Sequence, residues 1–81
     1  MQTRAEWMRE VDGLLTGTKH ERFARAKTMN VTAIAFILGV TDRQVKKIMR
    51  EAGYQGEQWG NSRIYDKANI FDAVKLAGIL S

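Results

Sequence analysis

Residues 43–50 carry a dense set of side chains that can bind nucleic acid. Arg43 and Arg50 each hold a guanidinium, which can donate two hydrogen bonds to O6 and N7 of guanine. Gln44 can pair in a similar way with adenine, and the ammonium groups of Lys46 and Lys47 suit phosphate oxygens. We therefore predict that this segment contacts duplex DNA. The alternative is an ordinary solvated helix face.

Polar residues outside this segment extend the predicted contact surface. Thr41 can anchor a phosphate through its backbone N–H or its hydroxyl group, and Asp42 can complement a helix N-terminus or accept a hydrogen bond from cytosine. Farther along the chain, Asn61, Ser62 and Arg63 can reach a neighbouring minor groove or its phosphates. The predicted DNA-binding residues are therefore Thr41, Asp42, Arg43, Gln44, Lys46, Lys47, Arg50, Asn61, Ser62 and Arg63.

Residue types that support catalysis or metal binding are scarce. The chain has no Cys and a single His, which excludes a disulfide scaffold, a thiolate zinc site and a Cys nucleophile. Its nine carboxylates are scattered along the sequence, unlike the cluster of a two-metal nuclease. We therefore predict a protein that is not an enzyme and that binds no cofactor and no metal.

The predicted contact residues lie within a pattern that is typical of a helix-turn-helix. Ala35 supplies the small residue needed where the second helix crosses the first, and Gly39 can adopt the positive φ of a sharp turn. Val40 is the apolar residue beneath the turn, and Val45 and Ile48 are inward residues that hold the second helix in place. Few random segments satisfy all of these requirements at this spacing.

Capping residues set the expected limits of the two helices. Asn30 is suited to cap a helix over residues 31–38, and Gly39 ends it. Thr41 can cap the next helix, which is expected to end before Gly53 with Val45, Ile48 and Met49 facing inward.

Three segments resemble the excisionase-like, MerR-related winged-helix domains, a group that includes the DNA-binding domains of some phage small terminase subunits. They are NVTAIAFILGVTDRQV (30–45), MREAGY (49–54) and RIYDKANI (63–70). The resemblance covers roughly residues 30–75. It implies a short helix-turn-helix, a β-hairpin wing that carries an aromatic or basic residue, and a closing helix. The chain departs from the usual pattern because no Pro precedes the wing and Trp59-Gly60-Asn61 leads into the turn.

Residues 1–29 are expected to form two further helices. Thr3 and Glu6 have the spacing of a capping box, and an apolar face follows that we interpret as core: Trp7, Met8, Val11, Leu14 and Leu15. This face has the alternative role of a homodimer interface. A second helix is expected over residues 18–27, with a buried face of Phe23, Ala24 and Ala26. Its basic residues either contact nucleic acid backbone or form an ordinary surface.

The C-terminal third predicts a hairpin and a closing helix. Residues 57–59 and 63–65 flank a turn cluster at 60–62. Trp59 is interpreted as packing beneath the hairpin, with base stacking as the alternative, and Tyr65 as locking the hairpin onto the closing helix. Asp66 is expected to cap that helix, whose apolar positions are Ile70, Phe71, Val74, Leu76, Ala77 and Ile79. His20 is expected to be exposed and inert.

The expected fold class is therefore mostly α, a winged helix-turn-helix with a short β-hairpin and two additional N-terminal helices. With 81 residues, the chain is expected to form a single domain over 1–81. Within it, residues 1–29 would be a helical extension and residues 30–78 the winged helix-turn-helix.

Charge and hydropathy complete the functional hypothesis. The net charge of +4 favours a polyanionic partner, and the longest apolar run has eight residues, too few to cross a membrane. We expect a protein of the cytoplasm, in a bacterial cell or a phage-infected host, that binds double-stranded DNA sequence-specifically. It would be a small transcriptional regulator or an excisionase-type architectural factor. The alternative is a protein-interaction module that binds a polymerase, a recombinase or a packaging partner.

Overall fold

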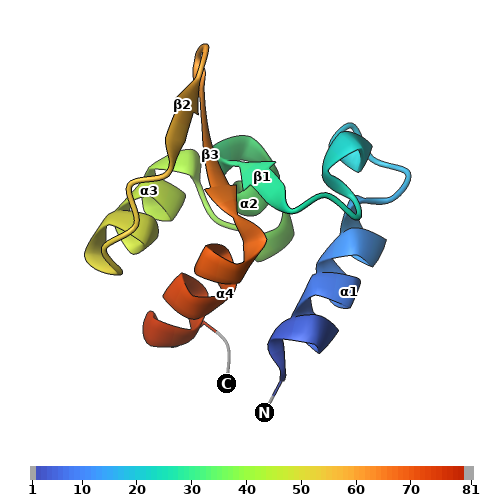
Figure 1. The fold of residues 1–81 in the computed structure, drawn as a ribbon, viewed down its shortest axis with the longest axis horizontal. Helices are drawn as coiled ribbons and strands as arrows, with labels where there is room; N and C mark the ends of the chain where they lie inside the picture. The colour runs from blue at the N-terminus through green and yellow to red at the C-terminus, as the bar shows by residue number, and fades with distance from the viewer. Residues whose placement is uncertain (1, 80–81) are drawn as a thin grey trace.

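The computed structural model describes residues 2–79, which fold into helices packed against a small sheet (Figure 1). Mostly helical structure with a short β-hairpin was expected and is confirmed. In chain order the elements are α1 (Arg4–Leu15), the 3₁₀ turn η1 (Glu21–Phe23), β1 (Thr28–Asn30), α2 (Val31–Leu38), α3 (Asp42–Glu51), β2 (Glu57–Trp59), β3 (Ser62–Asp66) and α4 (Lys67–Leu76).

The first helix begins at its predicted cap. The Thr3 hydroxyl accepts a hydrogen bond from the Glu6 backbone N–H at 3.2 Å, and it donates to the Glu6 carboxylate at 3.0 Å. Trp7, Val11 and Leu15 are buried in the core, as predicted. The prediction for Leu14 was wrong, because its side chain is 49% exposed. Trp7, Val11 and Leu15 occupy the side of α1 that faces the core, because they are spaced four residues apart. Leu14 is left on the exposed side of the helix.

The predicted second helix over residues 18–27 is wrong. Only η1 is helical there, and the chain then runs irregularly into β1, a strand that was not predicted. Arg25 has a φ of 62°, which no right-handed helix tolerates. The Phe23 carbonyl accepts a hydrogen bond from the Lys67 ammonium at 2.8 Å, so a distant charged group binds this turn. The N-terminal part therefore contains one helix rather than two.

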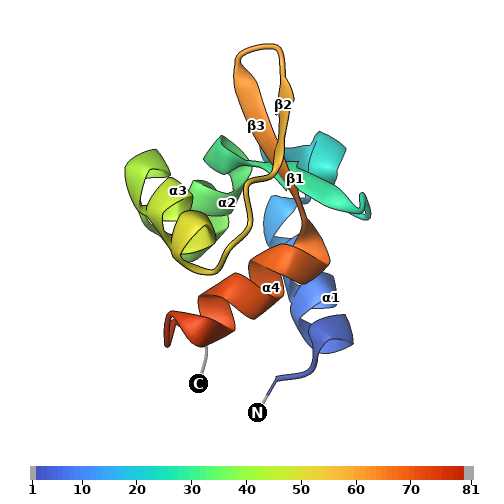
Figure 2. The ribbon, with the colours of Figure 1, turned by 60° about the vertical axis from the view of Figure 1, so that its left-hand side comes forward.

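The sheet joins distant parts of the chain in the order β1-β3-β2, with both pairs antiparallel. Met29 pairs with Tyr65 and Asn30 with Ile64, while Gln58 pairs with Arg63. The β2–β3 hairpin turns through Gly60 and Asn61 and projects away from the helices (Figure 2). The central strand β3 thus ties the hairpin to the start of α2.

The α2–turn–α3 unit forms as predicted. The Asn30 side chain caps α2 by accepting from the Ala33 N–H at 2.8 Å. Gly39 has φ 69°, and its N–H and that of Val40 both donate to the Ala35 carbonyl, at 2.9 and 3.2 Å. Because Gly39 has no Cβ, it adopts this left-handed conformation at low cost. The conformation lets the backbone N–H groups after α2 bond a carbonyl of its last turn, and it turns the chain toward α3.

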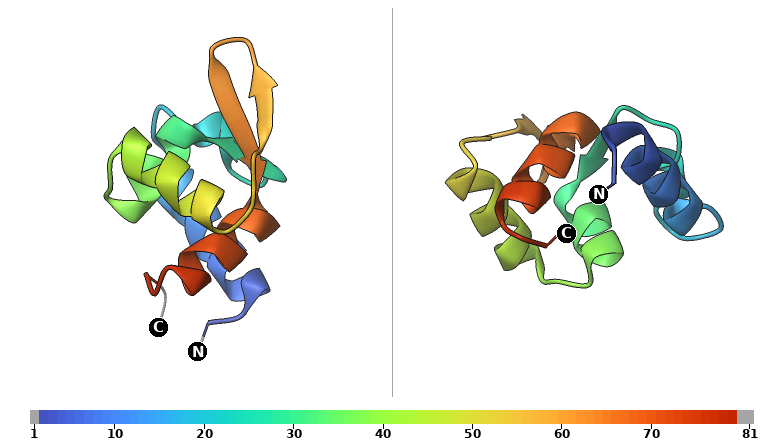
Figure 3. Two further views of the ribbon diagram at one scale, coloured as in Figure 1. Left: turned by 90° about the vertical axis from the view of Figure 1, so that its left-hand side faces the viewer. Right: turned by 90° about the horizontal axis from the view of Figure 1, so that it is seen from below.

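The closing helix packs between α3 and α1 (Figure 3, right). Its buried side includes Ile70, Phe71 and Val74, as predicted, and the Phe71 ring lies 5.7 Å from that of Trp7. The other predicted apolar positions, Leu76, Ala77 and Ile79, are exposed, to 76% for Leu76 and 42% for Ile79. Leu76 is the last residue of α4, and Ala77 and Ile79 follow it. Asp66 occupies the N-cap position, but its side chain makes no capping hydrogen bond.

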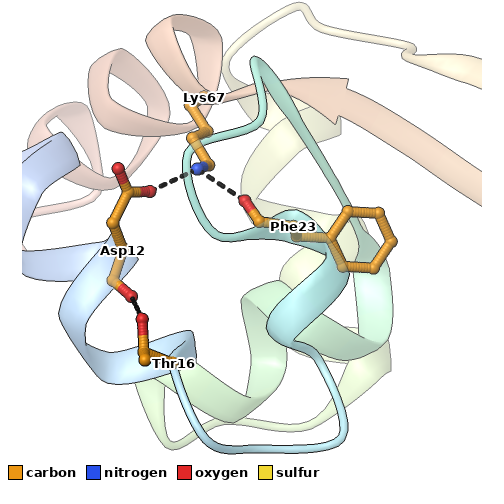
Figure 4. Close-up of polar contacts among 4 residues, drawn as sticks. All are labelled: Asp12, Thr16, Phe23 and Lys67. Atoms are coloured by element: carbon orange, nitrogen blue, oxygen red, sulfur yellow. Dashed lines mark hydrogen bonds and ion pairs between the residues drawn. The ribbon is translucent and has the colours of Figure 1, made fainter.

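One buried charge connects α4, α1 and the η1 loop (Figure 4). The Lys67 side chain is 2% exposed, and its ammonium donates to the Asp12 carboxylate at 2.7 Å and to the Phe23 carbonyl at 2.8 Å. Burial raises the pKa of Asp12, but the hydrogen bond from Lys67, the backbone of Arg25 and both positive charges outweigh it and hold that pKa below 3.8. The Asp12 carboxylate is therefore ionised at neutral pH.

His20 also lies inside the protein, so the prediction of an exposed histidine was wrong. It is 6% exposed, its ring centroid lies 5.3 Å from that of Phe36, and its Nε2 has no hydrogen-bond partner among the described residues. Burial, followed by the charges of Lys19 and Arg22, lowers the pKa of His20 below 6.5. The neutral imidazole is the form that the fold accommodates.

Removing Asp12 and removing Lys67 are expected to lower the free energy of unfolding by different amounts. Asp12→Ala leaves a fully buried ammonium with only a carbonyl partner, which should cost about 3–5 kcal/mol of unfolding free energy. Lys67→Met leaves a carboxylate that is 27% exposed and can be hydrated, so it should cost less, about 1.5–3 kcal/mol. Urea unfolding of both variants measures the difference. Equal costs, or a larger cost for Lys67→Met, would contradict this account of the site.

The buried His20 predicts a pH dependence of stability. Its pKa is lower in the folded than in the unfolded chain, so the unfolded state takes up the proton first as the pH falls below about 6.5. Stability should be constant above that pH and decrease below it, with a slope of at most about 1.4 kcal/mol per pH unit. Because the chain has one His, His20→Gln should flatten the profile between pH 7 and 5, as measured by urea unfolding. A parallel decrease in the variant would assign the titration to another group.

Candidate nucleic-acid interface

The exposed side of α3 carries the residues that were predicted to contact DNA. Val45 and Met49 are 1% exposed and Ile48 packs partly against the core, which turns the polar residues of the helix outward. The exposed residues of α3 are Asp42, Arg43, Gln44, Lys46, Lys47, Arg50 and Glu51, and all of these except Glu51 were predicted to contact DNA. The inward and outward sides of this helix therefore agree with the predicted pattern.

Two of the predicted contact residues, Thr41 and Gln44, are engaged in capping α3. The Thr41 hydroxyl accepts from the Gln44 N–H at 3.1 Å, and Gln44 Oε1 accepts from the Thr41 backbone N–H at 2.9 Å. The N–H that was predicted to hold a phosphate is therefore already bonded. A two-bond contact between Gln44 and adenine needs the same Oε1, so it would require this capping box to open.

The remaining residues of α3 form two rows because of the helical repeat. Asp42, Lys46 and Arg50 follow one another at intervals of four residues and face the hairpin, where they line its clefts. Arg43 and Lys47 form the adjacent row, which faces solvent and lines neither cleft. The first row can therefore act together with the hairpin, and the second projects beyond it.

A cleft in two parts separates α3 from the hairpin, and cations line its middle and one end. Figure 3 (left) shows α3 and the hairpin as the elements on its two sides. One part, of about 400 Å³, lies between the start of α2, the start of α3 and the hairpin; its lining is Asn30, Val31, Thr32, Asp42, Lys46, Gln58, Asn61, Ser62 and Arg63. The other part, of about 410 Å³, reaches the end of α3; its lining is Lys46, Arg50, Gly53, Tyr54, Gln55, Arg63 and Tyr65. Lys46 and Arg63 line both parts.

The hairpin residues have distinct positions around this cleft. Asn61 is in the turn at the tip, Ser62 begins β3, and Arg63 lies one residue further down. The Arg63 guanidinium donates to the Gln55 carbonyl, which fixes it against the loop after α3. Arg63 is therefore part of the cleft wall, and Asn61 alone of the three occupies the tip.

One carboxylate lies at the α2 end of the cleft. Asp42 is in the first turn of α3, where a negative charge complements the helix dipole, and its carboxylate accepts a hydrogen bond from the Thr32 hydroxyl at 3.5 Å. The cationic part of the cleft is thus its middle and its far end, at Lys46, Arg50 and Arg63.

The interpretation of Trp59 as a residue packed beneath the hairpin is wrong. Its side chain is 61% exposed, next to the turn at Gly60. All three residues of β2 are exposed, because β2 is an edge strand that no helix covers. Sequence reasoning could not detect this, since an aromatic residue in a strand is equally typical of a covered and an uncovered sheet face.

Several residues of the cleft were not predicted. Gln58 donates to the Gly60 carbonyl at 2.8 Å and stiffens the turn, while Thr32 and Tyr54 enter the lining from α2 and from the loop after α3. No local signal could identify them, because their place in the cleft depends on the pairing of β3 with both neighbours.

Comparison of the chain with protein-family models, curated proteins and solved structures gave no match. Within residues 2–79, no helix is both long and apolar enough to cross a membrane. In the same range, no three His, Asp or Glu side chains are grouped so that they could hold a metal ion.

Substitutions of Gly56 and Gly60 test how closely the start of the hairpin packs against β3. A Cβ on Gly56 would lie 2.7 Å from the Tyr65 ring and 2.8 Å from the Ile64 carbonyl, at φ 68°; a Cβ on Gly60 would meet nothing within 4 Å, at φ 60°. Gly60→Ala should therefore cost only the backbone strain, about 1–2 kcal/mol, and Gly56→Ala should cost clearly more. Thermal unfolding of both variants tests this. Equal costs would mean that the Gly56–Tyr65 contact does not hold the hairpin.

Proposed function

We propose that this protein binds duplex DNA sequence-specifically, with α3 in the major groove and the β2–β3 hairpin as a wing on the adjacent backbone. The observation that carries the proposal is the cationic cleft between them, lined by Lys46, Arg50 and Arg63. Support also comes from the order of α2, turn, α3, hairpin and α4, which is what the resemblance to excisionase-like winged-helix domains implies.

The two rows of α3 have different roles in this proposal. A major groove about 12 Å wide admits an α-helix, and the row that projects farthest meets the base edges. Arg43 heads that row and is the proposed reader of guanine. Lys46 and Arg50 face the cleft, so they would bind the phosphates of the strand that passes between α3 and the wing. Thr41 and Gln44 hold the start of α3 in shape.

The wing would contribute through its tip and its exposed aromatic side chain. Asn61 would reach the sugar-phosphate edge of the minor groove, and Ser62 and Arg63 would bind the phosphates on the cleft side. Trp59 presents an uncovered indole beside the tip, which suits packing against deoxyribose or an unstacked base. A polar hairpin of this size needs no core of its own, because β3 is held by β1 and α4.

Within this class we propose a small transcriptional regulator or an excisionase-type architectural factor of a phage or mobile element. Both uses require the same DNA contacts and no catalytic group, and selection of bound sites from a random duplex pool separates them. A palindromic site indicates a dimeric regulator, and tandem direct repeats indicate an architectural role.

The proposal predicts a salt-dependent affinity that depends on the cleft. Binding to a fluorescent duplex should weaken with salt at a log–log slope of about −0.9 for each neutralised phosphate. Lys46→Gln/Arg50→Gln should reduce the magnitude of that slope by about 1.8. Arg43→Ala should instead lower the preference for the selected site over random DNA by about 1–3 kcal/mol. Fluorescence anisotropy at several salt concentrations measures all of these.

A matched control removes the same charge elsewhere. Arg9→Gln/Lys75→Gln changes two exposed residues of α1 and α4 outside the cleft, and its slope should stay close to that of the parent. If the control loses as much of the salt-dependence slope as the cleft variant, binding depends on overall charge and not on the cleft. No binding at micromolar protein, or a slope near zero, would overturn the DNA proposal and leave the protein-interaction module as the function to pursue.

A further inference from the structure

A second group of cations lies outside the cleft, in the segment between α1 and β1. Lys19, Arg22, Arg25 and Lys27 are all exposed, and the only carboxylate in the segment is Glu21. Among residues 2–79, none of the four side chains forms an ion pair within 4.0 Å, since the ion pairs there are Arg4–Asp72 and Lys67–Asp12. The charge of Arg25 does act on Asp12 from a greater distance. Residues 19–27 therefore form a basic loop.

The basic loop is held rigidly although it has little regular structure. Phe23 and His20 are buried, the Thr18 hydroxyl donates to the Leu15 carbonyl at 2.6 Å, and the Lys67 ammonium binds the Phe23 carbonyl (Figure 4). The Arg22 guanidinium lies 4.8 Å from the centroid of the Phe23 ring, in a cation–π contact. The cations therefore start from fixed backbone positions, which reduces the entropy lost when they bind a ligand.

Arg25 gives an independent indication that the charge of this loop matters. Its φ of 62° is the one positive value at a non-glycine residue within 2–79; the other positive-φ residues are Gly17, Gly39, Gly53, Gly56, Gly60 and Gly78. A side chain there costs about 1 kcal/mol or more that glycine would avoid. Within the fold, the Arg25 backbone and charge both act on Asp12, and its side chain is otherwise exposed and available to a ligand.

The basic loop lies on the opposite side of the molecule from the cleft. In Figure 1, α3 is at one end of the longest dimension, which is 35 Å, and η1 is at the other end. When the molecule is turned so that α3 faces the viewer, η1 lies behind α2 and β1 (Figure 3, left). The basic loop is therefore separated from α3 by the body of the molecule.

The surface chemistry of the loop fits DNA backbone better than a protein partner. Its exposed residues are all charged, and its two aromatic rings are buried. Protein interfaces need an apolar centre, whereas phosphate contacts need only cations with accessible hydrogen-bond donors.

We propose that the basic loop binds the phosphate backbone of a second DNA segment, so that a single molecule holds two duplexes together. The inference rests on the proposed function for the first segment, which occupies the cleft. Recognition of the second segment would be independent of its sequence, because no residue of the loop is placed on an element that can enter a groove.

The test measures single-duplex binding and bridging separately, with the full chain. Anisotropy of one short fluorescent duplex reports the cleft, and retention of a fluorescent duplex on beads that carry an unlabelled duplex reports bridging. The parent protein should retain the fluorescent duplex at low salt. Lys19→Gln/Arg22→Gln/Lys27→Gln should retain at least about tenfold less while its anisotropy titration stays close to that of the parent.

Two further variants exclude other causes. Arg4→Gln/Arg9→Gln/Lys75→Gln removes the same number of positive charges from exposed sites on α1 and α4, and it should bridge like the parent. Arg25→Gly should raise the melting temperature, because glycine adopts positive φ freely, and should still lower retention. A more stable variant that bridges less cannot be explained by unfolding.

The remaining outcomes overturn the inference in distinguishable ways. Single-duplex binding without any retention on beads refutes the second site and leaves the proposed function intact. Retention that survives the loop substitutions assigns bridging to two clefts of a dimer, and retention lost equally in both triple variants assigns it to overall charge. Absence of single-duplex binding refutes the proposed function, and the inference with it.

Discussion

The arrangement of this small protein depends on a charge that is hidden from water. The Lys67 ammonium is buried at the first residue of α4, and a buried charge of this kind is tolerated only when it is paired and hydrogen-bonded. Asp12 on α1 and the Phe23 carbonyl supply those partners. Three segments that are far apart in the sequence must therefore meet at one point. This requirement holds residues 16–27 as a loop and sets where β3 ends and α4 begins.

The position of the β2–β3 hairpin follows from that constraint through β3. This strand runs directly into α4, so fixing Lys67 also fixes the base of the hairpin. On one side β3 pairs with β1, which leads into α2, and on the other it pairs with β2. Gly56 allows the returning chain to pass the Tyr65 ring closely. These pairings set the hairpin beside the α2–turn–α3 unit, and the cationic cleft is the space between them.

The same contact separates two positively charged surfaces. Lys46, Arg50 and Arg63 line the cleft on one side of the molecule, and the cations of residues 19–27 lie on the other. We propose that the first surface recognises DNA and that the second holds another DNA segment. A chain of 81 residues has little interior to spare, so both proposed contacts use its surface.

The sequence by itself determined the parts that depend on neighbouring residues. Caps at Asn30 and Thr41, the left-handed Gly39 and the spacing of Val45 and Met49 specify α2, the turn and α3, because these interactions span only a few residues. Tertiary structure decided the rest. The burial of His20 and Lys67, the exposure of Trp59 and the loss of the expected helix over 18–27 all depend on contacts across the chain. One of these is the bond between Asp12 and Lys67, which lie 55 positions apart in the sequence. Local periodicity carries no information about such partners, and the cleft between α3 and the hairpin exists only because those distant contacts form.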